Sequence, residues 1–356
     1  MVCAPHPVAR RGEERIAHVN ARLWLLTSCL LLGSCQQTPT GVDTLSQYLE
    51  RLSGATALAP RPLLPSNTSL APPKSVKIEI ARVEQIDLID FLSLSGCELQ
   101  INLGRRNSQL GRSASPSQRL LLDLEFIRLA PACIGLLLEK QDASLAGIIG
   151  RASAQRQQWL PLSIHQAVLA GPEWEAFWSA PTTLRDYPQQ TDSRIVETLI
   201  QLGRQIEAWL EGNWIASNRD FELLLSDLRA GDGGALLLSM DQVAKQLARA
   251  NDLLTRADKE RPLCPFGRKT TRSQAVEAVV KKFFVGEVQP WLVQLRQRKE
   301  LLSRPIAALE TPLVGVQPKQ YRDWVQRRDA LMESQTALIK GHVRVIQQVL
   351  SQCGGS

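Results

Sequence analysis

The end of the chain carries two adjoining rows of apolar side chains, and no other feature constrains the fold as strongly. Each row steps by seven residues. The rows consist of Trp324, Leu331, Leu338 and Val345 and of Val325, Met332, Ile339 and Ile346. Two such rows together form one wide apolar stripe along a helix. The sequence therefore predicts a long final helix that packs in an antiparallel hairpin or a bundle.

The composition of the whole chain also favours helices. Hydrophobic residues make up 44 % of the sequence but aromatic residues only 5 %, a balance that is atypical of β-sandwiches and barrels. We expect an all-α fold, an irregular helical bundle that ends in a long antiparallel helical hairpin. The connection between its two arms is expected at Pro305–Pro318.

Local signals place several helix ends. Ser115 is expected to cap a helix that ends near Pro131, because Pro116 and Gln118 follow it at the favoured positions. Ser239 is expected to start another helix, after a glycine-rich break at residues 231–234. Further helices are expected over residues 43–53, over residues 192–212, from Asn218 and from Thr271.

Two segments before residue 82 are less regular. Residues 55–75 contain five prolines among small residues, which indicates a semi-extended linker or a coil laid on the surface. Val76, Ile78 and Ile80 alternate with other residues and could form one short strand.

The N-terminus has the pattern of a bacterial lipoprotein signal. Four arginines precede an apolar run at residues 23–32, which is too short to span a membrane. Leu32-Gly33-Ser34-Cys35 then resembles a lipobox, so we expect cleavage after residue 34 and acylation of Cys35. Gln36 follows, and by the sorting rule for Gram-negative lipoproteins it predicts the outer membrane. The alternative is a secreted protein in which Cys35 is an ordinary half-cystine.

This interpretation divides the chain into three parts. Residues 1–34 are the signal peptide, residues 35–75 a lipidated tether with a short helix and the Pro-rich linker, and residues 76–356 a helical periplasmic domain. The net charge of +7 falls to about +5 once the signal is removed, a small excess that does not indicate nucleic-acid binding.

Four cysteines remain after Cys35. They are Cys97, Cys133, Cys264 and Cys353. An even number in an oxidising periplasm predicts two disulfides, and three pairings are open. Proximity favours Cys97–Cys133 and Cys264–Cys353, and the second pair would meet at the open end of the C-terminal hairpin. Without a CxxC motif the sequence predicts no metal site, and nothing in it indicates a cofactor.

One block of the sequence resembles a known family. Its segments are Phe91–Cys97, Arg106–Arg112 and Ala130–Ile134, and a Tyr48-Leu49-x-Arg51-Leu52 helix after the lipobox fits as well. In this order they resemble the proteobacterial lipoprotein family filed as domain of unknown function 3080. The resemblance covers almost all of the mature chain. It implies a lipoprotein and assigns no activity, substrate or catalytic residue.

A cluster of arginines is the most informative polar feature. Arg105, Arg106 and Arg112 lie between the first two mature cysteines, and guanidinium groups suit phosphates and carboxylates. An anionic lipid headgroup or cell-wall polymer would be a plausible ligand. The simpler interpretation is a solvated face, or arginines that cap carbonyls at helix ends.

Other residues that can carry chemistry are isolated in the sequence. No motif of a nucleophile or metal surrounds His165 or His342, which favours structural roles. Trp174 and Trp178 could form the lip of a groove, but core packing is the simpler interpretation. Asp123 and Glu125 are too close in a helix to share one face.

These observations together predict an uncharacterised lipoprotein of the outer membrane with its domain in the periplasm. We expect a binding, scaffolding or assembly role, with an envelope protein or an anionic cell-wall or lipid ligand as partner. No catalytic residue is identified. The alternative is a cell-wall hydrolase or another envelope enzyme.

Overall fold

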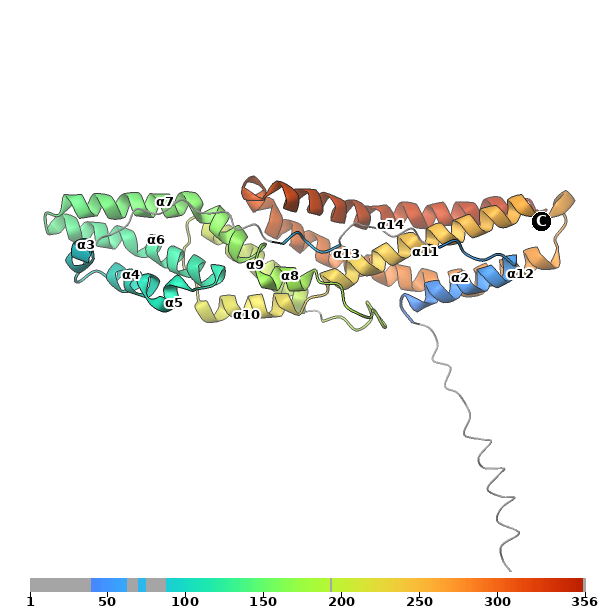
Figure 1. Ribbon diagram of the computed structural model, residues 1–356, viewed down its shortest axis with the longest axis horizontal. Coiled ribbons are helices and arrows are strands. Elements are labelled where there is room, and N and C mark those ends of the chain that lie inside the picture. The colour runs from blue at the N-terminus through green and yellow to red at the C-terminus, as the bar shows by residue number, and fades with distance from the viewer. Residues whose placement is uncertain (1–39, 63–69, 75–87, 193, 355–356) are drawn as a thin grey trace, which may run out of the picture. The chain divides into compact units, whose positions relative to one another are not determined.

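The computed structural model describes residues 40–62, 70–74, 88–192 and 194–354, and these residues fold into helices and their connections (Figure 1). No strand is present within those ranges, which confirms the all-α fold. The signal segment, Cys35 and the strand expected at residues 76–81 lie outside the described residues.

The described α-helices differ widely in length, from 4 residues in α5 to 33 in α14. In chain order the α-helices are α2 (Asp43–Thr56), α3 (Leu88–Ser93), α4 (Leu99–Asn107), α5 (Gln109–Arg112), α6 (Pro116–Glu139), α7 (Ala143–Ala167), α8 (Pro172–Phe177), α9 (Arg194–Leu210), α10 (Asn218–Arg229), α11 (Gly233–Glu260), α12 (Thr271–Val279), α13 (Gln289–Glu310) and α14 (Lys319–Ser351). Two short 3₁₀-helices, η1 (Pro265–Gly267) and η3 (Thr311–Val316), and one π-helix, η2 (Val280–Val288), complete the helical elements of the described residues.

Capping residues begin two of these helices much as their sequences predict. The Ser115 side chain accepts a hydrogen bond from the backbone N–H of Gln118 at 3.2 Å, and Pro116 occupies the first turn of α6. At the start of α12 the cap is Thr270, which forms a reciprocal pair of hydrogen bonds with Ser273. The expected start at residue 271 is therefore correct within one residue.

The helix expected to end near Pro131 continues to Glu139, so that prediction is wrong. A proline inside a helix lacks the N–H that would reach the carbonyl four residues earlier, which costs about 3 kcal/mol. Burial offsets this cost, because Ile127, Ala130 and Leu137 on either side of the proline are almost completely shielded from solvent. The tertiary contacts thus keep the helix intact.

The start predicted at Ser239 is also wrong, because Ser239 is fully buried inside α11. The helix begins six residues earlier at Gly233, inside the predicted glycine-rich break, whose last two residues belong to its first turn. A Cβ atom on Gly233 would come within 2.4 Å of the Phe177 ring, and one on Gly234 within 2.1 Å of the Ser179 carbonyl oxygen. These glycines therefore allow close packing against α8, in addition to breaking the preceding helix.

The buried apolar residues form two clusters. The smaller one joins α4 with the adjacent halves of α6 and α7, which lie side by side (Figure 1). The larger one includes the other halves of α6 and α7, then α2 and α8 to α14. Each cluster contains one disulfide, Cys97–Cys133 in the smaller and Cys264–Cys353 in the larger.

The final helix packs most extensively against α11 (Figure 1). Hydrogen bonds join Gln335 to Met240 and, near the ends of both helices, Gln352 to Asp258, so the two helices run in the same direction. An antiparallel pairing of the last two helices, as the hairpin requires, stays a prediction. Residues Thr40–Ser356 form one compact unit, to which α2 belongs.

Candidate functional site

The richest cluster of polar and aromatic side chains lies where α14 meets the ends of α7 and α13. Tyr321, Trp324 and Arg328 occupy positions three and four residues apart, so that one face of α14 presents all three. Glu310 ends α13, and His165 lies near the end of α7. All five side chains are buried.

A bidentate ion pair between Arg328 and Glu310 forms the centre of this cluster. The Arg328 guanidinium donates to both carboxylate oxygens of Glu310, at 2.7 and 2.8 Å, and its Nε donates to Asp329 at 2.8 Å. The guanidinium carbon Cζ of Arg328 also lies 5.0 Å from the ring centres of both Trp178 and Trp324, which is within the range of a cation–π interaction. Burial opposes the charge, but the hydrogen bonds and charge of Glu310 raise the pKa of Arg328 above its usual value.

Tyr321 extends this network toward α8. Its hydroxyl donates to Glu310 at 2.8 Å and accepts a hydrogen bond from the Trp174 indole at 3.0 Å. Burial, followed by the charge of Glu310, raises the pKa of Tyr321 well above its usual value, so the phenol stays protonated. The network therefore holds α8, α13 and α14 together with each of these groups satisfied.

His165 lies beside this network with neither ring nitrogen hydrogen-bonded to any described residue. It is 2 % exposed and packs edge-on against the Tyr321 ring at 5.6 Å. Burial lowers the pKa of His165 to about 4, so the ring is neutral at pH 7. A cavity of about 30 Å³ adjoins it, lined also by Pro72, Pro73 and Lys74. That volume holds a water molecule or two, whereas small-molecule sites span roughly 300–1,000 Å³.

The other mature histidine, His342, has two hydrogen-bond partners. Its Nδ1 lies 2.6 Å from the amide oxygen of Asn251, and its Nε2 lies 2.9 Å from the hydroxyl of Tyr48. An amide oxygen can only accept, so Nδ1 carries the proton and Nε2 accepts from the tyrosine. Burial lowers the pKa of His342 to about 4. This neutral imidazole joins α2, α11 and α14.

The two tryptophans of α8 and its C-cap belong to the core. Trp174 and Trp178 are both 0 % exposed and meet edge-on at 5.7 Å between ring centres. Both side chains therefore pack in the core, the simpler of the two interpretations, and Trp174 also lines the cavity beside His165.

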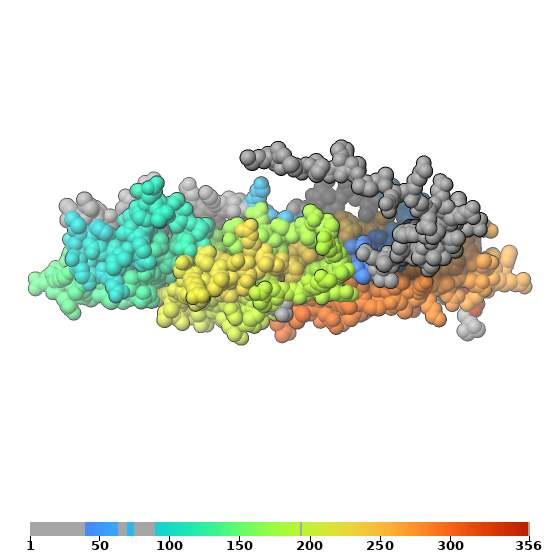
Figure 2. All heavy atoms as spheres, turned by 90° about the horizontal axis from the view of Figure 1, so that it is seen from below, coloured from blue at the N-terminus to red at the C-terminus, as the bar shows by residue number. Residues whose placement is uncertain are grey.

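Two of the three predicted anion-binding arginines have acidic partners within the protein. Arg105 pairs with Glu125 and Arg106 with Asp123, the two carboxylates whose spacing in the sequence had no evident use. Arg112 ends α5 and is exposed. The region that includes α4 and α5 forms the cyan part of the surface in Figure 2. These ion pairs compete with any external anion, and anion binding by these arginines stays a prediction.

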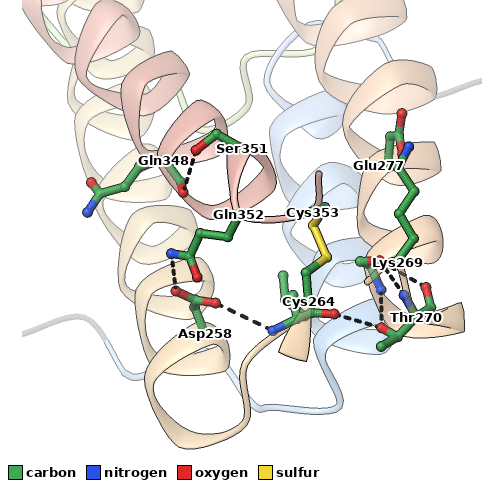
Figure 3. Close-up of a disulfide and its surroundings, with 11 residues drawn as sticks. Asp258, Cys264, Lys269, Thr270, Glu277, Gln348, Ser351, Gln352 and Cys353 are labelled. Carbon is green, nitrogen blue, oxygen red and sulfur yellow. Dashed lines mark hydrogen bonds and ion pairs between the residues drawn. A yellow bond between two sulfur atoms is a disulfide. The ribbon is translucent and has the colours of Figure 1, made fainter. Parts of the chain in front are cut away.

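Both cysteine pairs that proximity favours are present. The Cα atoms of Cys97 and Cys133 lie 5.4 Å apart, and those of Cys264 and Cys353 lie 4.9 Å apart. Figure 3 shows the second disulfide where α11 and α14 end, with Gln352 donating to Asp258 at 3.0 Å beside it. Each pair brings together segments that are separated by tens of residues.

Sequence reasoning missed the buried polar network on α14. The two predicted apolar rows flank a third row of Arg328, Gln335 and His342, and this third row is the more deeply buried. The available signal was the seven-residue spacing of these polar residues between the apolar rows. In the described part of the chain no three acidic, histidine or cysteine side chains are placed to hold a metal.

Comparisons with known proteins identify a family but no function. A family model described as "Protein of unknown function (DUF3080)" matches residues 45–356. Neither the curated proteins nor the solved structures contain a match to this chain. Within the residues that the structure describes, no helix is long and apolar enough to cross a membrane.

Proposed function

The chain belongs to the family described as Protein of unknown function (DUF3080), and we propose that it is a lipoprotein anchored to the outer membrane. Its helical domain faces the periplasm and has a binding, scaffolding or assembly role in the cell envelope. The two disulfides carry this proposal, because structural disulfides form and persist in oxidising compartments such as the periplasm.

The N-terminal sequence supports the same compartment independently. A basic segment, a short apolar run and Leu32-Gly33-Ser34-Cys35 follow one another in the order that lipoprotein processing requires. Each methylene of an acyl chain that enters the bilayer contributes about 0.8 kcal/mol, so two or three chains on Cys35 would retain the protein stably at the membrane.

The described site favours binding over catalysis. The Glu310–Arg328 pair and Tyr321 already satisfy one another, and with Pro72, Pro73 and Lys74 in place the cavity at His165 has room only for water. A cell-wall hydrolase or other envelope enzyme would need a cleft that admits a polymer between reactive groups. We therefore prefer contact with a partner at the surface.

Mass spectrometry of the mature N-terminus tests the anchor. We expect a lipid-modified Cys35 and recovery of the protein with the outer-membrane fraction, and we expect Cys35→Ala to abolish both. Cys29→Ala is the matched control, because Cys29 precedes the predicted cleavage site and its loss leaves acylation intact. An unmodified N-terminus elsewhere, or membrane recovery that survives Cys35→Ala, would contradict the proposal.

Crosslinking in intact cells tests the binding role. A periplasmic domain with such a role is expected to give a reproducible crosslink to one envelope protein or cell-wall polymer, lost when its contact surface is altered. Turnover of purified cell-wall fragments by the protein would instead support the enzymatic alternative.

A further inference from the structure

A short segment of the Pro-rich stretch lies on the site described above. We call residues Leu70–Lys74 the strap. The Trp324 indole N–H donates to the carbonyl oxygen of Leu70 at 3.0 Å. Residues Pro72, Pro73 and Lys74 line the cavity together with His165. The strap is thus held at one end by a directional hydrogen bond and at the other by packing.

The surface under the strap is aromatic, and one of its aromatic side chains donates a hydrogen bond to the strap. Trp174 and Tyr321 line the same cavity as the two prolines, and Trp324 supplies the N–H. Grooves of this composition bind extended proline-containing segments, because proline offers a rigid apolar ring, little chain entropy to lose and a carbonyl that accepts well.

Two polar groups add direction to this surface. His165 is buried with both ring nitrogens unpartnered among the described residues, and it lines the cavity together with Pro72 and Pro73. Glu175 lines the same cavity as Lys74 and has the opposite charge. The groove therefore suits two prolines followed by a basic residue, which is the sequence of the strap itself.

We propose that the groove formed by His165, Trp174, Tyr321 and Trp324 recognises an extended segment of a partner protein that carries two consecutive prolines and a following lysine or arginine. The strap occupies this groove in cis and mimics that ligand. The proposal deepens the binding role proposed above and is independent of acylation, so its failure and that of the anchor are distinguished by separate experiments.

Occupation in cis sets how tightly a partner can bind. A tethered segment acts at an effective concentration that reaches the millimolar range, and a competing segment binds only the fraction of molecules whose groove is open. Weakening the strap is therefore expected to strengthen binding of the same sequence supplied in trans.

Fluorescence anisotropy with a labelled peptide of residues 68–76 tests this expectation on the full mature chain. Pro72→Ser/Pro73→Ser is expected to bind the peptide at least about ten-fold more tightly than the wild type. The matched control, Pro62→Ser/Pro181→Ser, changes two exposed prolines and is expected to behave as the wild type.

A third variant tests the hydrogen bond that the Trp324 indole N–H donates to the bound segment. Adding Trp324→Phe to the strap variant keeps the aromatic ring but removes the N–H donor, and about a two- to ten-fold loss of affinity is expected. Equal binding of the wild type and the strap variant, or equal binding of a peptide with the same composition and separated prolines, overturns the proposal.

Chemical modification gives a second readout at the groove. Diethyl pyrocarbonate is expected to modify His165 faster in the strap variant, and the peptide to protect it, while His342 with its two partners serves as the internal standard. If the strap variant does not fold, excess peptide on the wild type is expected to speed hydrogen exchange in the strap. Unchanged exchange at saturating peptide overturns the proposal.

Discussion

The Glu310–Arg328 pair allows a sharp test of how the helical core is held together. Glu310→Gln removes one charge and keeps a side chain of the same shape, which can still accept from Tyr321. Both members of the pair are 5 % exposed, so in this variant the Arg328 charge would stay buried without the bidentate Glu310 carboxylate. Breaking a buried pair in this way costs about 3–5 kcal/mol, a large fraction of the roughly 5–15 kcal/mol that stabilises a domain.

A double-mutant cycle separates this effect from simple loss of packing. Arg328→Met alone leaves the Glu310 carboxylate buried, whereas Glu310→Gln/Arg328→Met removes both charges together. We expect the double variant to be more stable than the sum of the single effects predicts, with a coupling free energy of about 2–3 kcal/mol.

Urea unfolding followed by far-ultraviolet circular dichroism measures these free energies. Tryptophan fluorescence adds a local probe, because Trp178 and Trp324 flank the guanidinium. Asp323→Asn is the matched control, since it breaks an exposed ion pair with Lys319 on the same helix and is expected to leave stability unchanged. A loss below about 1 kcal/mol for Glu310→Gln, or strictly additive effects, would refute the reasoning.

Two further stability predictions follow from buried groups. Burial lowers the pKa of His165 and His342 to about 4, against about 6.5 in the unfolded chain, so the unfolded state takes up protons first as the pH falls. We expect the free energy of unfolding to be at its full value above about pH 6.5 and to fall by about 3 kcal/mol per histidine toward pH 4. A urea concentration at the unfolding midpoint that does not change over this pH range would contradict the prediction. Replacing Cys264 and Cys353, which are 89 residues apart in the chain, with serines removes their disulfide. The chain-entropy model predicts that this lowers the free energy of unfolding by about 4–5 kcal/mol. Urea unfolding measures that loss too, and a change below about 1 kcal/mol would show that the disulfide does not restrict the unfolded chain as assumed.

Local sequence signals determined the type of fold and several of its boundaries. Apolar periodicity predicted helices, and the cap at Ser115 is where the structure has it, because a cap depends on residues within one turn. Nearness along the chain also favoured the two cysteine pairs that the structure contains. A cap needs only the bonded neighbourhood of a residue, and among possible cysteine pairs the ones nearer in the chain lose less entropy on closing their loops, so the sequence is enough to favour both.

The candidate site depended on contacts that sequence spacing does not encode. A straight α-helix has 3.6 residues per turn, so a row of residues taken at seven-residue steps drifts slowly around the helix. The most deeply buried face of α14 runs between the two predicted apolar rows. Arg328, Gln335 and His342 can lie on that face only because Glu310, Met240 and Tyr48 bring them partners from other helices.

The same distinction explains the helix ends that were predicted wrongly. Pro131 and Ser239 carry strong local signals for an end and a start, yet both lie inside long helices. Burial of the neighbouring apolar side chains offsets the lost hydrogen bond at Pro131, and the packing of Gly233 and Gly234 against α8 moves the start of α11. The sequence by itself determined the helices as local units, and the tertiary structure alone decided where they continue and which polar groups they bury, because those outcomes depend on partners that are remote in the chain.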